Sequence, residues 1–150
     1  MNALYAQFVR PSDLVFDVGA HVGDRLRAFR RLGASVVAVE PQPALFGTLK
    51  ALFGRDDTVT LVRSAIGRKT GHATMMINLD NPSISTLSKE FIAASRDAAG
   101  WQGQAWPQSL QVPVTTLDEL IDVHGVPSFI KLDIEGLEAE ALAGLSRPVS

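Results

Sequence analysis

The chain has 150 residues, of which 46% are hydrophobic and 20% charged, which excludes a disordered or low-complexity protein. Cysteine is absent, so disulfides and cysteine-ligated metals are excluded, and the formal net charge of −2 gives no reason to expect nucleic acid as a partner. A chain of this length buries roughly 68–70% of its unfolded surface, and no repeat or linker divides it, so we expect one domain over residues 1–150.

The N-terminal residues 1–10 contain neither a basic region nor a long apolar region, and they therefore make a poor signal peptide. No segment approaches the roughly 18 uninterrupted apolar residues that a membrane span requires. We expect a cytoplasmic protein without a membrane partner.

The first part of the chain alternates short apolar runs with amphipathic segments. The apolar runs predict buried strands, and the segments between them predict helices of about ten residues. Strands are expected at 14–18, 35–40 and 58–63, and helices at 24–32 and 43–53. This βαβαβ order predicts a parallel sheet with right-handed crossovers.

The middle of the chain is less regular. We expect a turn at 67–71, a strand at 72–79 and a short helix at 88–98. The stretch 81–107 is long enough to be functional rather than purely structural. Trp101 and Trp106 within it are either a substrate wall or ordinary partly buried aromatics.

The last part returns to strands and helices. Residues 111–115 predict a strand, which Pro113 places at a sheet edge, and Thr116 with Glu119 forms a capping box for a helix at 116–123. A fourth parallel strand at 129–133, a helix at 137–145 and the beginning of a fifth strand at 147–150 follow. We expect a truncated sheet whose fourth strand is a bare edge, open to self-association.

Parallel sheets bind ligands beyond the carboxyl ends of their strands. The first such end carries Asp17-Val-Gly-Ala-His-Val-Gly23. Its G-x-x-x-G spacing differs from the dinucleotide pattern G-x-G-x-x-G. Asp17 would repel a pyrophosphate but favour an amine or a sulfonium, and the following helix N-terminus could hold a carboxylate. The alternative is a tight turn that binds nothing.

Glu40 ends the second strand, where an acid can accept hydrogen bonds from both ribose hydroxyls. The alternative is a solvated carboxylate. Together with Asp17 and the glycines, Glu40 describes an adenosyl ligand with an amino-acid tail, which is S-adenosylmethionine.

Asp133 and Glu135 flank the end of the fourth strand, and Lys131 shares a face with Asp133 by strand period. These groups could steer a substrate hydroxyl or take its proton. Lys131 could equally form an ion pair with a carboxylate, and Glu135 could favour the next helix N-terminus. His21 is either a base or a solvent-facing loop residue. His72 and His124 lack partners at metal spacing, so we predict no metal site.

Several segments together resemble the FkbM-type methyltransferases over residues 14–144. They are FDVGAHVGD at 16–24, VEP at 39–41, AIG at 65–67, VTTLD at 114–118 and IKLDIEGLE at 130–138. The last segment is the most specific, whereas the glycine loop alone indicates only the wider class of S-adenosylmethionine-dependent enzymes.

The resemblance implies a Rossmann-like class I methyltransferase fold, doubly wound on a mostly parallel sheet. It implies methyl transfer from S-adenosylmethionine to an oxygen of a small molecule or sugar. It places Asp17, Gly19 and Gly23 around the methionine part, Glu40 at the ribose, Ser64 and Ala65 at the adenine and Asp133 near the methyl. The expected catalytic set is Asp133, Glu135 and Lys131, and the expected cofactor set is Asp17, Gly19, Ala20, His21, Gly23, Glu40, Pro41, Ser64, Ala65 and Asp133.

Two other functions stay open from the sequence. A nicotinamide-dependent oxidoreductase agrees with the acid after the second strand but not with Asp17 or the glycine spacing. A non-catalytic binding or dimerisation module agrees with the expected bare edge but not with the apparently complete ligand crevice.

Overall fold

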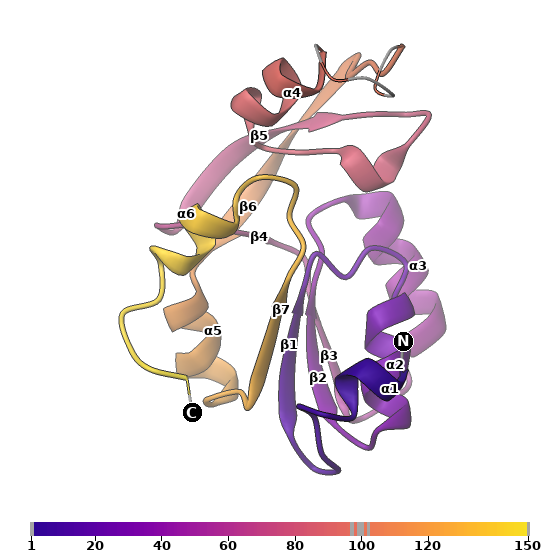
Figure 1. Cartoon of the computed structure of the whole chain (residues 1–150), viewed down its shortest axis with the longest axis vertical. Coiled ribbons are helices and arrows are strands. Elements are labelled where there is room, and N and C mark those ends of the chain that lie inside the picture. Colours follow the sequence, from indigo (N-terminus) through magenta and orange to yellow (C-terminus); the bar gives the residue numbers. More distant parts are fainter. Residues whose placement is uncertain (1, 97, 99–100, 102, 150) are drawn as a thin grey trace.

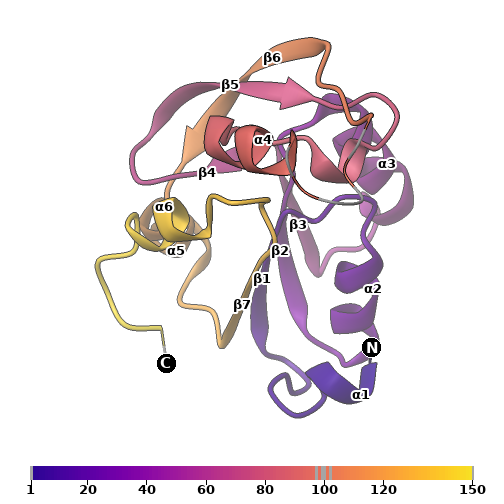
Figure 2. The ribbon, with the colours of Figure 1, turned by 45° about the horizontal axis from the view of Figure 1, so that its top comes forward.

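The computed structural model describes residues 2–96, 98, 101 and 103–149. These residues form two sheets, with helices on both faces of the larger one (Figure 1). The smaller sheet lies across one end of the larger sheet in both views (Figure 2).

The larger sheet is parallel and contains β1 (Leu14–Val18), β2 (Ser35–Val39), β3 (Val59–Val62) and β7 (Phe129–Leu132) in the order β3-β2-β1-β7. All four strands were predicted within about two residues. Each is a short apolar run in which β-branched residues are frequent, and such runs form strands buried by crossover helices. The strand order reverses between the first and fourth parallel strands, because β1 pairs with β2 on one side and with β7 on the other.

Side chains of β1 alternate between two cores. Val15 packs in a cluster with Leu26 and Phe29 of α2 (Asp24–Arg31) and with residues of α3 (Pro43–Phe53). Phe16 and Val18 point to the other face, where the cluster includes residues of α5 (Leu117–His124) and α6 (Glu138–Leu142). The short α1 (Asn2–Tyr5) joins the first core through a tilted ring contact between Tyr5 and Phe29, whose centroids are 4.6 Å apart. The sheet is therefore covered on both faces, as predicted for a doubly wound fold.

The smaller sheet was not predicted as a unit. It contains β4 (Ala65–Ile66), β5 (Gly71–Ile77) and β6 (Gln108–Thr115) in the order β4-β6-β5. The prediction that Pro113 marks an edge strand was wrong, because β6 is the central strand. Proline is tolerated there because β4 pairs only with Val114 and Thr115, so Pro113 lies outside that ladder.

Two helical segments connect β5 to β6, namely η1 (Pro82–Ile84) and α4 (Lys89–Arg96). The helix α4 lies within the predicted range 88–98, of which residue 97 falls outside the described residues. At the other end of β6, the predicted capping box at α5 is confirmed, since the Thr116 hydroxyl accepts a hydrogen bond from the Glu119 N–H at 3.1 Å.

The described part of the C-terminal segment runs along α5. The predicted strand at 147–150 is wrong for residues 147–149, which pair with no strand, and Ser150 lies outside the described residues. Arg147 instead pairs with Asp122 at 2.9 Å and with Asp118 at 3.5 Å. Strand β7 is an edge of the larger sheet, as expected, and self-association through it stays a prediction. No helix in the described ranges is long and apolar enough to cross a bilayer.

Gly23 and Gly47 allow a matched test of backbone packing. Gly23 has φ +90°, and an added Cβ would lie 2.5 Å from Phe53 Cε2, whereas a Cβ on Gly47 in α3 would meet nothing within 4 Å. We expect Gly23→Ala to lower the free energy of unfolding by roughly 1–3 kcal/mol through strain and overpacking. Gly47→Ala should raise it by about 0.5–1 kcal/mol through helix propensity. Urea titration measures both, and equal changes would contradict this packing.

Candidate functional site

A cavity of about 360 Å³ opens beyond the carboxyl ends of the four parallel strands. Residues at the ends of all four strands line this one cavity. The residues expected from the sequence that line it are Gly19, Ala20, His21, Glu40, Pro41, Ser64, Ala65, Lys131, Asp133 and Glu135. The structure therefore gathers most of the expected set at one place.

Glu40, directly after β2, is the most constrained acid in the wall. It is only 4% exposed, and its two carboxylate oxygens accept hydrogen bonds from the backbone N–H groups of His21 and Gln42, each at 3.0 Å. Burial raises the pKa of Glu40, and the two backbone hydrogen bonds oppose that rise. Each oxygen keeps a lone pair for a further donor, so the carboxylate is fixed and still able to accept.

The glycine loop after β1 touches both neighbouring strands. The N–H groups of Gly19 and Ala20 both donate to the Val39 carbonyl at 3.0 Å. Gly19 has φ +75°, and an added Cβ would lie 2.0 Å from the Asp133 carbonyl oxygen. Only glycine permits this approach, because any side chain would collide with backbone.

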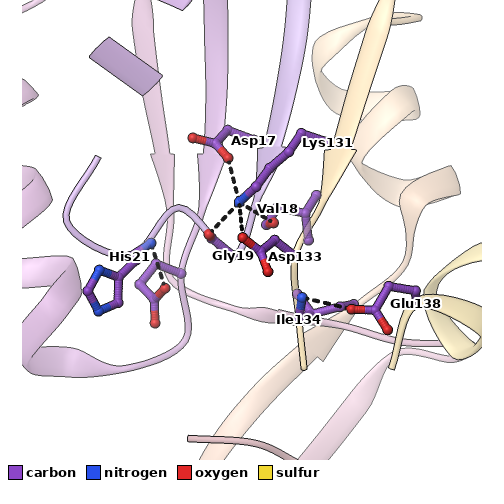
Figure 3. Close-up of polar contacts among 9 residues, drawn as sticks. Asp17, Val18, Gly19, His21, Lys131, Asp133, Ile134 and Glu138 are labelled. Atoms are coloured by element: carbon purple, nitrogen blue, oxygen red, sulfur yellow. Dashed lines mark hydrogen bonds and ion pairs between the residues drawn. The ribbon is translucent and has the colours of Figure 1, made fainter. Parts of the chain in front are cut away.

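Beneath the loop, Asp17 and Lys131 form a buried ion pair (Figure 3). They are opposite one another in the β1–β7 register, with Lys131 Nζ 3.1 Å from Asp17 Oδ1. The same ammonium donates to the carbonyls of Gly19 at 2.7 Å and Val18 at 3.2 Å and lies 3.7 Å from Asp133 Oδ2. Burial raises the pKa of Asp17, and the Lys131 charge lowers it.

This arrangement decides between the alternatives for Lys131. The ion pair with a neighbouring carboxylate is confirmed, and the ammonium also donates hydrogen bonds to two backbone carbonyls. Asp17, which is fully buried, lies behind the cavity wall rather than in it. Gly23 is also absent from the wall and packs against Phe53. The structure therefore does not bring Asp17 or Gly23 to the ligand cavity as the sequence suggested.

The turn after β7 presents two acids. Glu135 has φ +49° and Gly136 φ +93°, and the Glu138 carboxylate holds this turn by accepting hydrogen bonds from the N–H groups of Ile134 at 3.1 Å and Gly136 at 3.2 Å. A non-glycine residue in this conformation is uncommon and often marks a functional position. Burial, with the charges of Asp133 and Glu138, raises the pKa of Glu135.

The wall opposite the strand ends comes from residues that the sequence did not predict. Pro82, Ser85, Thr86 and Leu87 line the cavity, and we call residues 82–87 the cover segment. Gln42 donates to the Pro82 carbonyl at 3.1 Å, and the Thr86 hydroxyl donates to the Glu135 carbonyl at 2.9 Å. The only sequence signal for this wall was the length of the irregular stretch.

Of the tryptophans and the loop histidine considered from the sequence, only His21 lines the cavity. Trp101 packs edge-on against Phe91 at 5.6 Å, and the Trp106 indole donates to the Ile84 carbonyl at 2.9 Å. Neither lines the cavity, so the tryptophans are partly buried aromatics. His21 lies in the wall and is half-buried. Among the described residues, no group of three or more His, Asp or Glu side chains could hold a metal ion.

A parallel sheet with helices on both faces and a cavity at the carboxyl ends of its strands places this chain in the doubly wound α/β class, whose members bind ligands at this edge of the sheet. Residues 17–150 match the family model of the methyltransferase FkbM domain. The chain therefore belongs to the FkbM methyltransferase domain family, as the sequence motifs had indicated.

The chain is also similar to several individual proteins. The chain is 28% identical over 159 residues to the 31-O-demethyl-FK506 methyltransferase FkbM of Streptomyces tacrolimicus, and the alignment covers 91% of this chain and 61% of the relative. A Clostridium thermocellum structure provisionally described as an rRNA methylase matches at 18% identity and TM-score 0.39, over 43% of this chain and 38% of that one. A Galdieria sulphuraria structure provisionally described as a sarcosine dimethylglycine methyltransferase matches at 17% and TM-score 0.34, over 39% and 24%.

Replacing Lys131 tests the buried ion pair. Lys131→Met leaves Asp17 buried without its partner, and we expect a loss of about 3–5 kcal/mol in the free energy of unfolding at pH 7. Without the ammonium, the Asp17 pKa in the folded state rises further above its unfolded value of about 3.9. The folded variant then binds more protons than the unfolded chain, so its stability falls as pH rises above about 4.

Chemical denaturation at pH 4 and pH 7 measures this effect. The difference between wild type and Lys131→Met should be smaller at pH 4, and Asp17→Asn/Lys131→Met should lose much less stability at pH 7 than Lys131→Met alone. An equal loss at both pH values would contradict the ion-pair explanation.

Glu138→Ala tests the turn after β7. Removing two backbone hydrogen bonds should cost about 1–2 kcal/mol and accelerate amide hydrogen exchange at Ile134 and Gly136. Glu140→Ala is the matched control, because Glu140 lies in the same helix but pairs with exposed Arg68. If both variants exchange alike at these two amides, Glu138 does not hold the turn.

Proposed function

We propose that this chain binds S-adenosylmethionine in the cavity and transfers its methyl group to a hydroxyl oxygen of a small molecule or sugar. The observation that carries the proposal is the Glu40 carboxylate, fixed by two backbone N–H groups at the end of β2 beside a loop that only glycine permits. Family membership independently favours the same cofactor.

The residues present fit this cofactor in linear order. The strand order β3-β2-β1-β7 places Ser64 and Ala65 at one end of the cavity, Glu40 next, the Gly19 loop after it and Asp133 at the other end. The adenine and the ribose of the cofactor follow one another in the same order, and its methionine part would then lie between the Gly19 loop and Asp133. Ser64 and Ala65 would flank the adenine, and Glu40 would accept from the ribose hydroxyls. The cavity volume of about 360 Å³ lies within the range of small-molecule sites.

Charge at the β7 end suits the reactive part of the ligand. Asp17, Lys131 and Asp133 together carry one net negative charge when the acids are ionised, and the Asp133 side chain is 56% exposed. A negative charge beside the expected sulfonium stabilises binding of the cationic cofactor. Lys131 acts here as a positioning residue, because its ammonium is committed to the protein.

Catalysis then requires orientation of the acceptor and removal of its proton. When bound, S-adenosylmethionine supplies a methyl group on a positively charged sulfur. Glu135 is positioned to take the proton from the acceptor hydroxyl, because it lines the cavity and its raised pKa brings it closer to neutral pH, where a general base is most effective. Asp133, whose charge is partly balanced by Lys131, would lie beside the sulfonium that carries the methyl group. The cover segment forms the opposite wall and excludes water.

Calorimetry with S-adenosylhomocysteine tests cofactor binding, with NADH as the control ligand. We expect micromolar binding, about −8 kcal/mol, for the former alone. Glu40→Gln should weaken it by roughly 10- to 100-fold, because a charge-assisted hydrogen bond is worth about 1.5–3 kcal/mol. Asp57→Asn, which removes an exposed acid outside the cavity, should bind like wild type. Binding of NADH instead would favour an oxidoreductase, and binding of neither ligand would contradict the proposal.

A further inference from the structure

The cavity wall contains one arginine that the sequence analysis did not select. Arg25, in the first turn of α2, lines the cavity and is half-buried. Among the described residues it forms no hydrogen bond or ion pair, in contrast to Lys131 in the same wall, whose ammonium contacts two carbonyls and two carboxylates. The wall therefore holds a guanidinium that the fold does not use.

Two other arginines of α2 have partners in the protein and lie outside the cavity wall. Arg30 pairs with Asp56 at 2.9 Å, and Arg27 lies over the Phe53 ring at 6.0 Å. Neither lines the cavity. Glu40 in the same wall is held by two backbone N–H groups, and within the described part of the chain no hydrogen bond or ion pair joins it to Arg25 to offset its charge. A guanidinium facing a cavity without a protein partner is suited to a carboxylate or phosphate of a ligand.

We propose that Arg25 binds the carboxylate of the amino-acid tail of the cofactor; this rests on the proposed function. The helix α2 follows the Gly19 loop at the end of β1, one strand beyond Glu40 in the order β3-β2-β1-β7. A ligand whose ribose lies at Glu40 and whose adenine lies beyond β3 carries its tail over this loop. The positive charge of Arg25 also lowers the pKa of Asp17 on β1, so the guanidinium lies within electrostatic range of the end of that strand.

The amino-acid tail of the cofactor is a zwitterion, and Asp133 supplies the negative group for its ammonium. Asp133, on the β7 side of the same loop, offers a carboxylate that is 56% exposed to the ammonium and the sulfonium. Arg25 offers the complementary cation on the α2 side. The tail of the cofactor carries one negative and one positive group on the same carbon, and the cavity presents one partner for each.

Ligand truncation isolates this contact. S-adenosylhomocysteine has the carboxylate, whereas 5′-methylthioadenosine retains the adenine, ribose and sulfur but lacks the amino-acid tail. We expect Arg25→Gln to weaken the former by roughly 10- to 100-fold, the effect of losing one charge-assisted hydrogen bond pair, and to leave the latter unchanged within about twofold. Arg25→Lys, which retains the charge but not the planar fork, should lie between.

Arg27→Gln is the matched control, because it removes the same charge from the same helix outside the cavity, and it should bind both ligands like wild type. Equal weakening of both ligands by Arg25→Gln would overturn the inference, because it would show a structural effect on the cavity. Unchanged binding of S-adenosylhomocysteine would overturn it as well. Failure of the wild type to bind either ligand would instead overturn the proposed function, and this inference with it.

Discussion

The Asp17–Lys131 ion pair is the interaction on which the geometry of this site depends. One ammonium contacts Asp17 on the neighbouring strand β1, the carbonyls of Val18 and Gly19 where β1 leads into the glycine loop, and the Asp133 carboxylate. Burying two opposite charges yields little net stability, because desolvation offsets their attraction. What the pair provides is position: it holds the end of β7 against the end of β1, where the Gly19 Cα lies so close to the Asp133 carbonyl that a Cβ would not fit.

The place of Lys131 between two carboxylates affects the charge of the cavity wall. Lys131 balances one of the two carboxylates it touches, so the β7 end of the wall stays anionic, with Glu40 and Glu135 adding acids whose pKa values are raised by burial. Because the Lys131 ammonium contacts protein groups on several sides, the proposed mechanism assigns acid–base chemistry to the carboxylates. A wall of this kind favours a cationic ligand over a pyrophosphate, which agrees with the glycine spacing of the loop.

The larger sheet could be predicted because each of its strands is encoded by a short continuous stretch of sequence. Each strand is an apolar run that ends at a polar or glycine residue, and parallel topology follows from the alternation of strands with helices. The smaller sheet could not be predicted, because β4 has two residues and β6 contains Pro113, so its pairing depends on contacts distant in sequence. Asp17 was misplaced for a related reason: the motif fixes its distance from Gly19 but not the face of β1 to which it points.

A hydrogen bond joins the cover segment to the turn after β7, although Thr86 and Glu135 are 49 positions apart in the sequence. Thr86 exchanges two backbone hydrogen bonds with Met76 of β5, at 2.8 and 3.0 Å, while its hydroxyl holds the Glu135 carbonyl. The turn has positive φ angles at Glu135 and Gly136, and the Glu138 carboxylate accepts hydrogen bonds from two of its backbone N–H groups. In the proposed mechanism, the motif at 130–138 supplies the carboxylates, whereas the smaller sheet fixes where the proposed base lies relative to the cover segment. The two contributions come from different parts of the chain, and only the motif leaves a local signature in the sequence.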